Sequence, residues 1–444
     1  MIAPTIPDPV IAIFAHGFGG TNGLPLPRSL FTYLLGFAIV LTFVVLRVVA
    51  PKPRPPREQS AAAPVASASP SIPFLIARAV GLALFVGTLL AAAVGTNDNG
   101  ANIAPTTVIV MFFLGAQVAS VLLGDVYWAF NPFDTIAALI FGRDDHKRLS
   151  TADPPSWTAA AFLFAFFWFV FAYPEFYPPT PSEVAVFLAT YTIAVVAGAA
   201  VWGRGWIRDG EGFSALFAQL ARLSPLAWDR ERRRVTLRPP VQGAEGGSDS
   251  SGTVAVLVVF LGGVLFDGLS QTSWWITVLG TSRAWSERLL NSVGLIWCVA
   301  VIGCVYVGAC RVIARMSRRS PGDVVKQFAG VLLPVGAAWS IAHYLTAFLI
   351  DVQNFVALLS DPLGRGWDLF GTINNSINYR LLTPSQTGWI QTLTLAFGCL
   401  GGALVAHDIA FSSYRGRTAA RVTYPLATVV ILAAAGSIWL LLGS

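Results

Sequence analysis

Apolar stretches long enough to cross a lipid bilayer recur from one end of this chain to the other. A spanning helix needs roughly 17 to 25 mostly apolar residues, and ten segments of the sequence meet that requirement. They are Leu30 to Ala50, Pro73 to Val94, Pro105 to Leu123, Trp157 to Tyr173, Glu183 to Trp202, Val254 to Ser270, Asn291 to Arg311, Val324 to Asp351, Trp389 to Ala410 and Tyr424 to Leu442. We therefore predict an all-α fold, a polytopic transmembrane helical bundle of about ten spans. Residues 1–444 would form a single integral membrane domain.

The composition agrees with burial of most of the chain in lipid. Hydrophobic residues make up 55% of the sequence and charged residues 12%, whereas a soluble domain is about a quarter charged. The loops between the apolar segments are too short to form a separate soluble core. The net charge of +6 comes from basic residues gathered in particular loops, which is typical of membrane topology and does not suggest nucleic-acid binding.

The basic residues also predict the orientation of the chain. Cytoplasmic loops carry an excess of Lys and Arg. Of the 29 such residues, 23 fall in the loops after the first, third, fifth, seventh and ninth spans. This alternation supports the number of spans and places both chain termini on the extracytoplasmic side.

Two cytoplasmic segments stand out by composition. Residues 51–71 are rich in Pro, Ala and Ser, which predicts a disordered linker. Residues 203–252 form the largest cytoplasmic loop, and its Gly/Ser-rich end from Pro239 to Gly252 is also predicted to be disordered. Within this loop, Glu211 to Leu223 has the pattern of an amphipathic helix lying on the inner leaflet. Its apolar stripe consists of Phe213, Leu216, Phe217, Leu220 and Leu223.

Three short patterns predict local structure. Phe130 to Phe141, which Asn131 and Pro132 open as a turn, is predicted to be a second helix lying on the inner leaflet, after the third span. Gly398 and Gly402 form a GxxxG step, which permits close packing between helices. The four cysteines include no CxxC pair, so they do not indicate a zinc or redox site.

Ionisable side chains inside the apolar spans are the main candidates for function, because hydrocarbon offers them no water and the protein must supply a partner. His343 lies in the eighth span, roughly 24 Å from its inner end at the usual helical rise per residue. Asp267, in the sequence LFDGLSQTSWW, lies roughly 20 Å along the sixth span by the same rule. Since the depths are similar, we predict that the two side chains face a common interior in the outer half of the bundle.

Other polar residues divide between the two sides of the membrane. Asp351 belongs to the same stripe of the eighth span as His343, but about 12 Å of helix separates them, too far for both to bind one ion directly. The residues assigned to the outer side, which compete for a place in the site, are His16, Asp98, Asp361 and Asp368. His407 and Asp408 fall near the inner face, away from His343, and their role stays open. Each of these residues also has a structural interpretation, in which neighbouring polar groups satisfy it.

Several spaced motifs resemble a known family. They are HGFGGTNGLPLP, GDVYWAFNPF, ARLSPLAW, FDGLSQTSWW, AHYLTAFLIDVQ with SDPLGRGWDLFG, and AHD. Together they cover most of the chain, which resembles the polytopic membrane proteins of high-GC bacteria commonly labelled fenitrothion hydrolase. The resemblance implies a bacterial plasma-membrane protein that hydrolyses an organophosphorus ester. It supplies no established catalytic residues.

Hydrolysis of a phosphotriester would require an activated water, most simply on a divalent metal such as zinc held by His and carboxylate ligands. The predicted metal ligands are His16 and His343, with Asp267 as a third ligand or as a residue that orients one. The predicted catalytic base is Asp351 or Asp98.

Two other functions fit the same residues. In a proton-coupled permease, His343 and Asp267 would carry protons or contact a solute within the membrane. In a structural or assembly protein, the Arg-rich cytoplasmic loops would be contact sites. The predicted partners are the lipid bilayer and a small hydrophobic or organophosphorus molecule, and the oligomeric state is left open.

Overall fold

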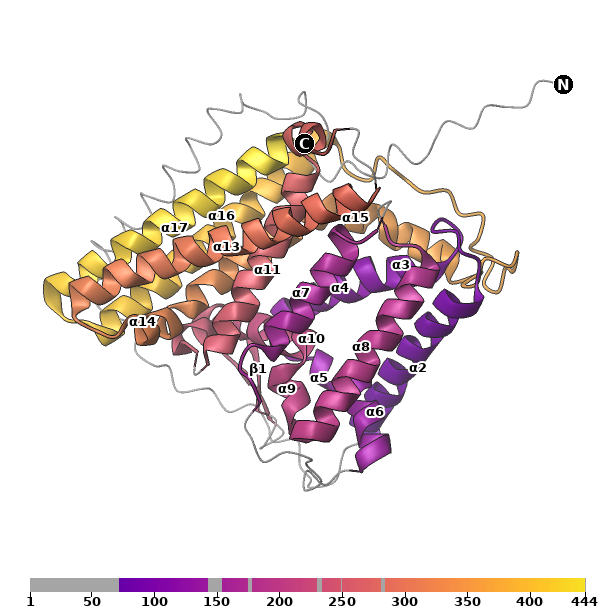
Figure 1. The fold of residues 1–444 in the computed structure, drawn as a ribbon, viewed down its shortest axis with the longest axis horizontal. Coiled ribbons are helices and arrows are strands. Elements are labelled where there is room, and N and C mark those ends of the chain that lie inside the picture. The colour runs from indigo at the N-terminus through magenta and orange to yellow at the C-terminus, as the bar shows by residue number, and fades with distance from the viewer. Residues whose placement is uncertain are drawn as a thin grey trace.

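The structure, a computed structural model, describes residues 72–142, 154–174, 178–229, 234–248, 250–280 and 284–443. Within these ranges the chain is a bundle of helices with one small antiparallel hairpin (Figure 1), so the predicted all-α bundle is confirmed. The longer helices are α2 (Ile72–Val94), α4 (Phe113–Leu123), α6 (Pro132–Phe141), α7 (Thr158–Phe171), α8 (Pro181–Trp202), α10 (Gly212–Leu220), α11 (Ser251–Ser270), α13 (Ala284–Ser317), α15 (Leu332–Leu358), α16 (Pro384–Ser413) and α17 (Gly416–Gly443). The short elements are α3 (Ile103–Thr106), η1 (Thr107–Phe112), α5 (Tyr127–Phe130), η2 (Arg204–Trp206), α9 (Ile207–Gly210), η3 (Ala221–Leu223), β1 (Leu226–Asp229), β2 (Arg234–Leu237), η4 (Gln242–Gly246), α12 (Ser273–Leu279), α14 (Pro321–Gln327) and η5 (Ala329–Val331).

Seven helices or joined helices are long and apolar enough to cross a membrane, counted over the described residues. They coincide with the second, third and fifth to ninth predicted spans. At the fourth, α7 has 14 residues and is shorter than a usual span. Helix α17 lies at the tenth, although it is not among the seven. The first predicted span, Leu30 to Ala50, lies outside the described residues, as do the linker 51–71 and His16.

Local sequence explains where several helices begin. Thr180 and Thr383 cap α8 and α16: each hydroxyl accepts a hydrogen bond from the backbone three residues on, and a Glu or Gln there reaches back. This capping box satisfies backbone donors that the first helical turn leaves unpaired. Asn131 caps α6 through its side-chain oxygen, and Pro132 follows it. The helix opening predicted at these two residues is therefore confirmed.

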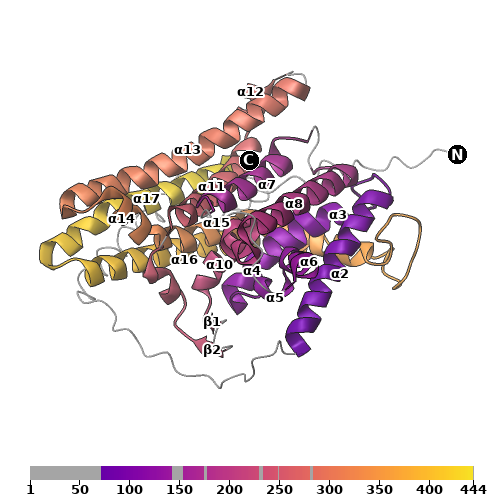
Figure 2. The same cartoon turned by 60° about the horizontal axis from the view of Figure 1, so that its bottom comes forward.

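Helices α11 and α15 lie at the centre of the bundle. In the most apolar part of each span, 83% of the residues are buried in α11 and 89% in the span formed by α14 and α15. In α2 only 17% are buried. In Figure 1, α11 lies between α13, α16 and α17 on one side and α2, α6 and α8 on the other. Figure 2 shows the same division after rotation, with α15 between α17 and α2. Most of α11, and α15 as far as Tyr344, are thus enclosed by protein, whereas much of α2 faces outward.

Two glycines allow α16 to pack closely on α15. A Cβ atom at Gly398 would lie 2.2 Å from the Cβ of Ala338, and one at Gly402 would lie 3.0 Å from a methyl group of Val335. Any larger residue at the first position would force the helices apart. The close packing predicted from the GxxxG step is therefore present, and the partner helix is α15.

The eighth predicted span is interrupted near its inner end. Helix α14 ends at Gln327, the 3-10 turn η5 follows, and α15 begins at Leu332. A Cβ at Gly330 would lie 1.9 Å from the carbonyl oxygen of Ala244, so η4 packs directly on the break. Arg222 holds η4 in place by donating its Nε–H to the carbonyl of Gly243 at 2.9 Å. The segment from Pro239 to Gly252, which we expected to be disordered, thus contains an ordered turn that covers an opened helix.

The amphipathic helix predicted between Glu211 and Leu223 is present as α10 and η3. Its apolar stripe, however, is enclosed by protein, because Leu216, Phe217 and Leu220 are 0% exposed. Helix α10 packs against α4, α7 and α11. The stripe therefore serves the core of the bundle, since periodicity alone does not distinguish a lipid-facing surface from a protein-facing one.

The hairpin of β1 and β2 follows this helix and was not predicted. Leu226 pairs with Leu237 and Trp228 with Val235 in an antiparallel register. The indole of Trp228 donates to the carbonyl oxygen of Leu123 at 2.7 Å. The hairpin is thereby attached to the end of α4.

Candidate functional site

The central feature of the bundle is a contact between His343 on α15 and Asp267 on α11. The Nε2 atom of His343 lies 3.0 Å from Oδ2 of Asp267. Their side chains are 5% and 1% exposed, respectively. The predicted proximity of these two residues, 76 positions apart in sequence, is therefore present in the fold. This contact does not test their predicted roles as metal ligands, which stay predictions.

Small residues on both helices make this contact possible. A Cβ at Gly336 on α15 would lie 3.1 Å from the ring of Phe260 on α11, so the two helices approach closely below the pair. Gly262 and Gly263 on α11 allow α13 and α7 to approach from other sides, because a Cβ at either would lie within 2.6 Å of Val299 or Phe167. Helix α11 is therefore surrounded on several sides, and Asp267 lies within that enclosure.

Aromatic and polar side chains complete the surroundings of His343. The ring of Tyr344 lies edge-on to His343 at 4.8 Å and edge-on to Phe113 of α4 at 6.2 Å between centroids. Gln391 of α16 is 0% exposed and donates its amide to the carbonyl of Ala342 at 2.9 Å. The histidine is thus enclosed by residues from α4, α11 and α16.

A His–Asp pair in such a place changes its net charge when it binds a proton. With a neutral imidazole and an ionised carboxylate, the pair carries one negative charge. Protonation of the imidazole gives an ion pair with no net charge. The net charge of the pair therefore depends on whether it holds this proton.

An apolar cavity of about 280 Å³ begins one helical turn from His343. Val335 and Trp339 of α15 and Leu265 of α11 line it, and α13 and α17 supply the other walls. The indole nitrogen of Trp339 is buried and has no hydrogen-bond partner within the described ranges. A small apolar solute with one acceptor group would fit the chemistry of this space.

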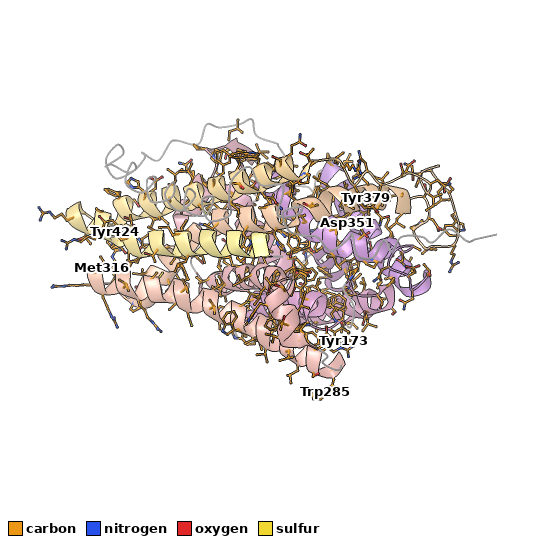
Figure 3. The ribbon with its side chains drawn as sticks, turned by 90° about the horizontal axis from the view of Figure 1, so that it is seen from above. Tyr173, Trp285, Met316, Asp351, Tyr379 and Tyr424 are labelled. Carbon is orange, nitrogen blue, oxygen red and sulfur yellow. The ribbon has the colours of Figure 1, made fainter. Side chains whose placement is uncertain are left out.

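The other predicted site residues lie elsewhere. Asp351 lies two turns from His343, near the end of α15, where the loop that carries Tyr379 returns (Figure 3). Asp98 lies in the turn between α2 and α3, where its carboxylate accepts a hydrogen bond from the backbone of Gly100. That turn bonds to Leu363, beyond the end of α15, and about 22 Å of helix separates this end from His343. Of the predicted residues that the structure describes, His343 and Asp267 are the two brought together.

Asp361 and Asp368 stabilise the loop after α15. Asp361 is 5% exposed and accepts hydrogen bonds from the backbone of Arg365 at 2.9 Å and Gly366 at 2.6 Å. Asp368 accepts one from the backbone of Ile373 at 3.3 Å. These contacts agree with the structural interpretation of both carboxylates.

His407 and Asp408 belong to another part of α16. Both are buried, and the His407 ring stacks on Phe411 with centroids 4.4 Å apart. Gln391, which contacts the residue before His343, lies sixteen residues earlier on the same helix, about 24 Å away along the axis. The prediction that His407 and His343 do not share a site is consistent with this separation.

No group of three or more His, Cys, Asp or Glu side chains is placed to hold a metal ion in the described part of the chain. The His343 and Asp267 pair therefore offers two donors, fewer than the three protein ligands usual for catalytic zinc. His16, the other predicted ligand, lies outside the described residues.

A second buried carboxylate, Glu211, was missed by sequence reasoning. It is 0% exposed and accepts hydrogen bonds from the hydroxyls of Tyr191 and Ser214 and from the backbone of Phe213 and Ser214. Burial raises the pKa of Glu211 above its usual range, although these hydrogen bonds lower it in part. Glu211 is the N-cap of α10. The signal was an acidic residue directly before an amphipathic helix.

The chain matches no protein-family model, no curated protein and no solved structure. Its function is therefore argued from the residues themselves.

Proposed function

We propose that this protein is a multi-pass plasma-membrane permease in which a proton held by His343 and Asp267 is coupled to the movement of a small hydrophobic solute. The observation that carries the proposal is the 3.0 Å contact between these two side chains on the two most enclosed spans. Ionisable residues in such positions are typical of proton relays in pumps and transporters. The proposal includes about ten spans and extracytoplasmic termini, as the apolar segments and basic loops predict.

The interrupted eighth span supports this function. Discontinuous helices are a recurrent feature of transporters, where opened backbone lies in a protected part of the bundle. Here the break between α14 and α15 is covered by η4 and lies on the same span as His343. A change in the charge of the pair would act on a span whose helix is already interrupted.

The apolar cavity beside Trp339 supports the choice of solute. It lies between α11 and α15, which carry the pair, and α13 and α17, which enclose it from the other side. A solute in this cavity would contact the same two helices that proton binding affects. Coupling requires that the proton and the solute both shift the equilibrium between the same two conformations of the protein. The proton pair and the cavity are both on α11 and α15, which meets that requirement.

The hydrolase implied by the family resemblance is the alternative. It needs a metal-activated water, and its support is the resemblance together with the predicted ligands His16, His343 and Asp267. The assembly role rests on the Arg-rich loops alone. The permease is favoured because it requires no ligand beyond the two side chains that are in contact.

Everted membrane vesicles containing the protein test the proposal. The vesicles are energised to an acidic interior, which quenches a pH-sensitive dye, and small hydrophobic compounds, including an organophosphorus triester, are added one at a time. We expect at least one compound to release the quench through the wild-type protein and not through Asp267→Asn. The control is Asp323→Asn, since Asp323 has a side chain that is 72% exposed and lies on α14. Release that is equal with Asp267→Asn would contradict the proposal.

A further inference from the structure

The sequence GDVYWAFNPFD, residues 124–134, has no part in the proposed proton site, yet it separates two cavities. Its apolar members face one cavity: Val126, Phe130, Pro132 and Phe133. Its polar and aromatic members face the other: Asp125, Trp128, Asn131 and Asp134. Tyr127 lines both. The segment is therefore a boundary between a polar and an apolar space.

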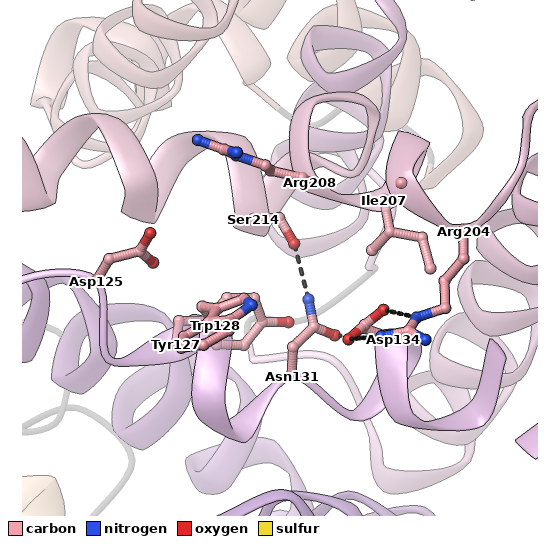
Figure 4. A pocket seen from close by; sticks show the side chains of 10 residues that line it. Asp125, Tyr127, Trp128, Asn131, Asp134, Arg204, Ile207, Arg208 and Ser214 are labelled. Atoms are coloured by element: carbon pink, nitrogen blue, oxygen red, sulfur yellow. Dashed lines mark hydrogen bonds and ion pairs between the residues drawn. The ribbon is translucent and has the colours of Figure 1, made fainter. Parts of the chain in front are cut away.

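The polar space is a cleft of about 340 Å³ between α5 and α6 on one side and η2, α9 and α10 on the other (Figure 4). At one end, Asp134 is shared by two guanidinium groups: Arg204 donates to it at 2.6 Å, and Arg78 also pairs with it. This end therefore has a surplus of positive charge. Asp125 lies at the opposite end of the cleft, and Arg208 borders the space between (Figure 4). The cleft thus carries guanidinium groups at one end and a carboxylate at the other, with Arg208, which also pairs with Asp209 at 3.9 Å, between them.

The apolar space has a volume of about 490 Å³, within the range of ligand-binding pockets. Its walls come from α2, η1, α4, α8 and α10, with Phe355 of α15 at one side. Leu84, Met111 and Phe187 are typical of the lining, which is almost entirely aliphatic and aromatic. An acyl chain is the kind of group that this space accepts.

Tyr127 lies where the two spaces meet. It is 6% exposed, and its hydroxyl has no hydrogen-bond partner among the residues that the structure describes. The rings of Phe112 and Phe217 hold it from two sides, at 5.6 and 5.1 Å between centroids. Burial raises the pKa of Tyr127, so the hydroxyl remains a neutral donor. A buried donor without an acceptor is costly, and an ester oxygen between a headgroup and its acyl chains would satisfy it.

The wall of the apolar cavity has two further features of a ligand site. Thr107–Phe112 forms a π-helix, a rare conformation that occurs frequently at functional sites. Thr107, Val108, Met111 and Phe112 of this segment line the cavity. Gly115, one turn on, also lines it, and a Cβ atom there would meet nothing within 4 Å. The absence of a side chain at Gly115 thus leaves space that the fold does not require.

We propose that the cleft and the apolar cavity together bind one phospholipid with a zwitterionic phosphate and amine headgroup. The phosphate lies toward Arg204 and Arg208, the ammonium toward Asp125, an ester oxygen at Tyr127, and an acyl chain in the cavity. This site is in the half of the bundle formed by α2 to α10, so it does not depend on the proton pair.

Native mass spectrometry of the full-length protein in detergent tests the site with added dioleoyl phosphatidylethanolamine. Gly115→Leu places a side chain in the cavity, and we expect it to weaken binding about tenfold. Gly87→Leu is the matched control, because Gly87 on α2 is exposed and a Cβ there also meets nothing within 4 Å. Arg208→Gln, at a side chain that is 63% exposed, should weaken binding by about threefold to tenfold. Equal binding by wild type and Gly115→Leu, or equal loss in Gly87→Leu, would overturn the proposal.

The choice of probe tests the headgroup. Phosphatidylglycerol carries the phosphate without the amine, diacylglycerol lacks both, and inorganic phosphate lacks the chains. We expect each to bind the wild-type protein more weakly than phosphatidylethanolamine by about tenfold or more. Equal retention of phosphatidylglycerol or diacylglycerol would overturn the zwitterionic assignment, and saturation by inorganic phosphate alone would overturn a lipid site. Melting temperatures of the variants, expected to match wild type, show that changes in binding are not losses of fold.

Discussion

Asp267 and Glu211 are both buried carboxylates, one in each half of the bundle, but their partners differ. Asp267 is in contact with the imidazole of His343, a group that can itself gain or lose a proton. Glu211 accepts hydrogen bonds from neutral hydroxyls and backbone amides, which cannot change charge near neutral pH. The first carboxylate belongs to a pair with two charge states. The second caps a helix.

The two carboxylates differ in ways that support the role proposed for Asp267 and the capping role of Glu211. Burial alone does not distinguish them, since both side chains are almost fully enclosed. What distinguishes them is whether the partner titrates and whether the partner comes from a distant part of the chain. Glu211 is held largely by the first turn of its own helix, whereas Asp267 joins α11 to α15.

The largest effect is expected from removal of one member of the pair. Asp267→Ala leaves His343 buried without its carboxylate, which should cost about 3–5 kcal/mol of stability. The double variant Asp267→Leu with His343→Leu removes both polar groups and should recover most of that loss. Thermal or denaturant unfolding in detergent measures both. Failure of the double variant to recover would contradict an unpaired buried charge as the source of the loss.

Helix packing is the next largest effect, because α16 packs closely on α15, the helix that carries His343. Gly398→Ala would place a methyl group 2.2 Å from Ala338, so we expect α16 to shift from α15 at a cost of about 1–3 kcal/mol. Gly308→Ala on α13 is the control, because a Cβ there meets nothing within 4 Å. Equal unfolding midpoints for the two variants would contradict close packing at Gly398.

Much of this arrangement could be predicted from the sequence. Hydrophobic length predicted ten spans, and seven of them coincide with long apolar helices among the described residues. The helical rise placed His343 and Asp267 at similar depths, and the two are in contact. The depth of a residue in the membrane does not determine which way its side chain faces around the helix, or which helices lie beside it. Asp98 was a candidate site residue because it was assigned to the same side of the membrane as His343. In the fold, the turn that contains Asp98 bonds to the loop after α15, far from His343. Glu211 was missed because its burial depends on α10 folding under α4 and α7, a tertiary contact that no local pattern specifies.

A smaller effect is expected at Glu211, with a pH dependence that tests its role. Glu211→Gln keeps one acceptor but places an amide against backbone donors, so we expect a loss of about 1–2 kcal/mol. The pKa of Glu211 is raised in the fold, so its contribution to stability is fully present below the unfolded pKa of about 4.5. That contribution falls as the pH rises through the folded pKa. The difference between wild type and Glu211→Gln should therefore be largest in acid and narrow toward neutral pH. A difference that widens as pH rises would contradict this assignment.

The last prediction is that His343 has no effect on the hydrolysis of a phosphotriester. If the pair is a proton site and does not activate a water, a p-nitrophenyl phosphotriester should release p-nitrophenol at the same rate with wild-type protein, with His343→Gln and with protein-free membranes. Absorbance of the phenolate measures the rate, with and without added zinc. Release that requires both zinc and His343 would favour the hydrolase implied by the family resemblance.

The protonation state of His343 is the most direct measure of the central claim. The chain has four histidines, so ¹⁵N-histidine labelling gives few resonances, and His343→Gln identifies the relevant one in lipid nanodiscs. We expect the chemical shifts of the His343 ring nitrogens to change when Asp267→Asn replaces the carboxylate that lies 3.0 Å from Nε2. Ring-nitrogen shifts of His343 that are the same in wild type and in Asp267→Asn would contradict a proton held between these two side chains.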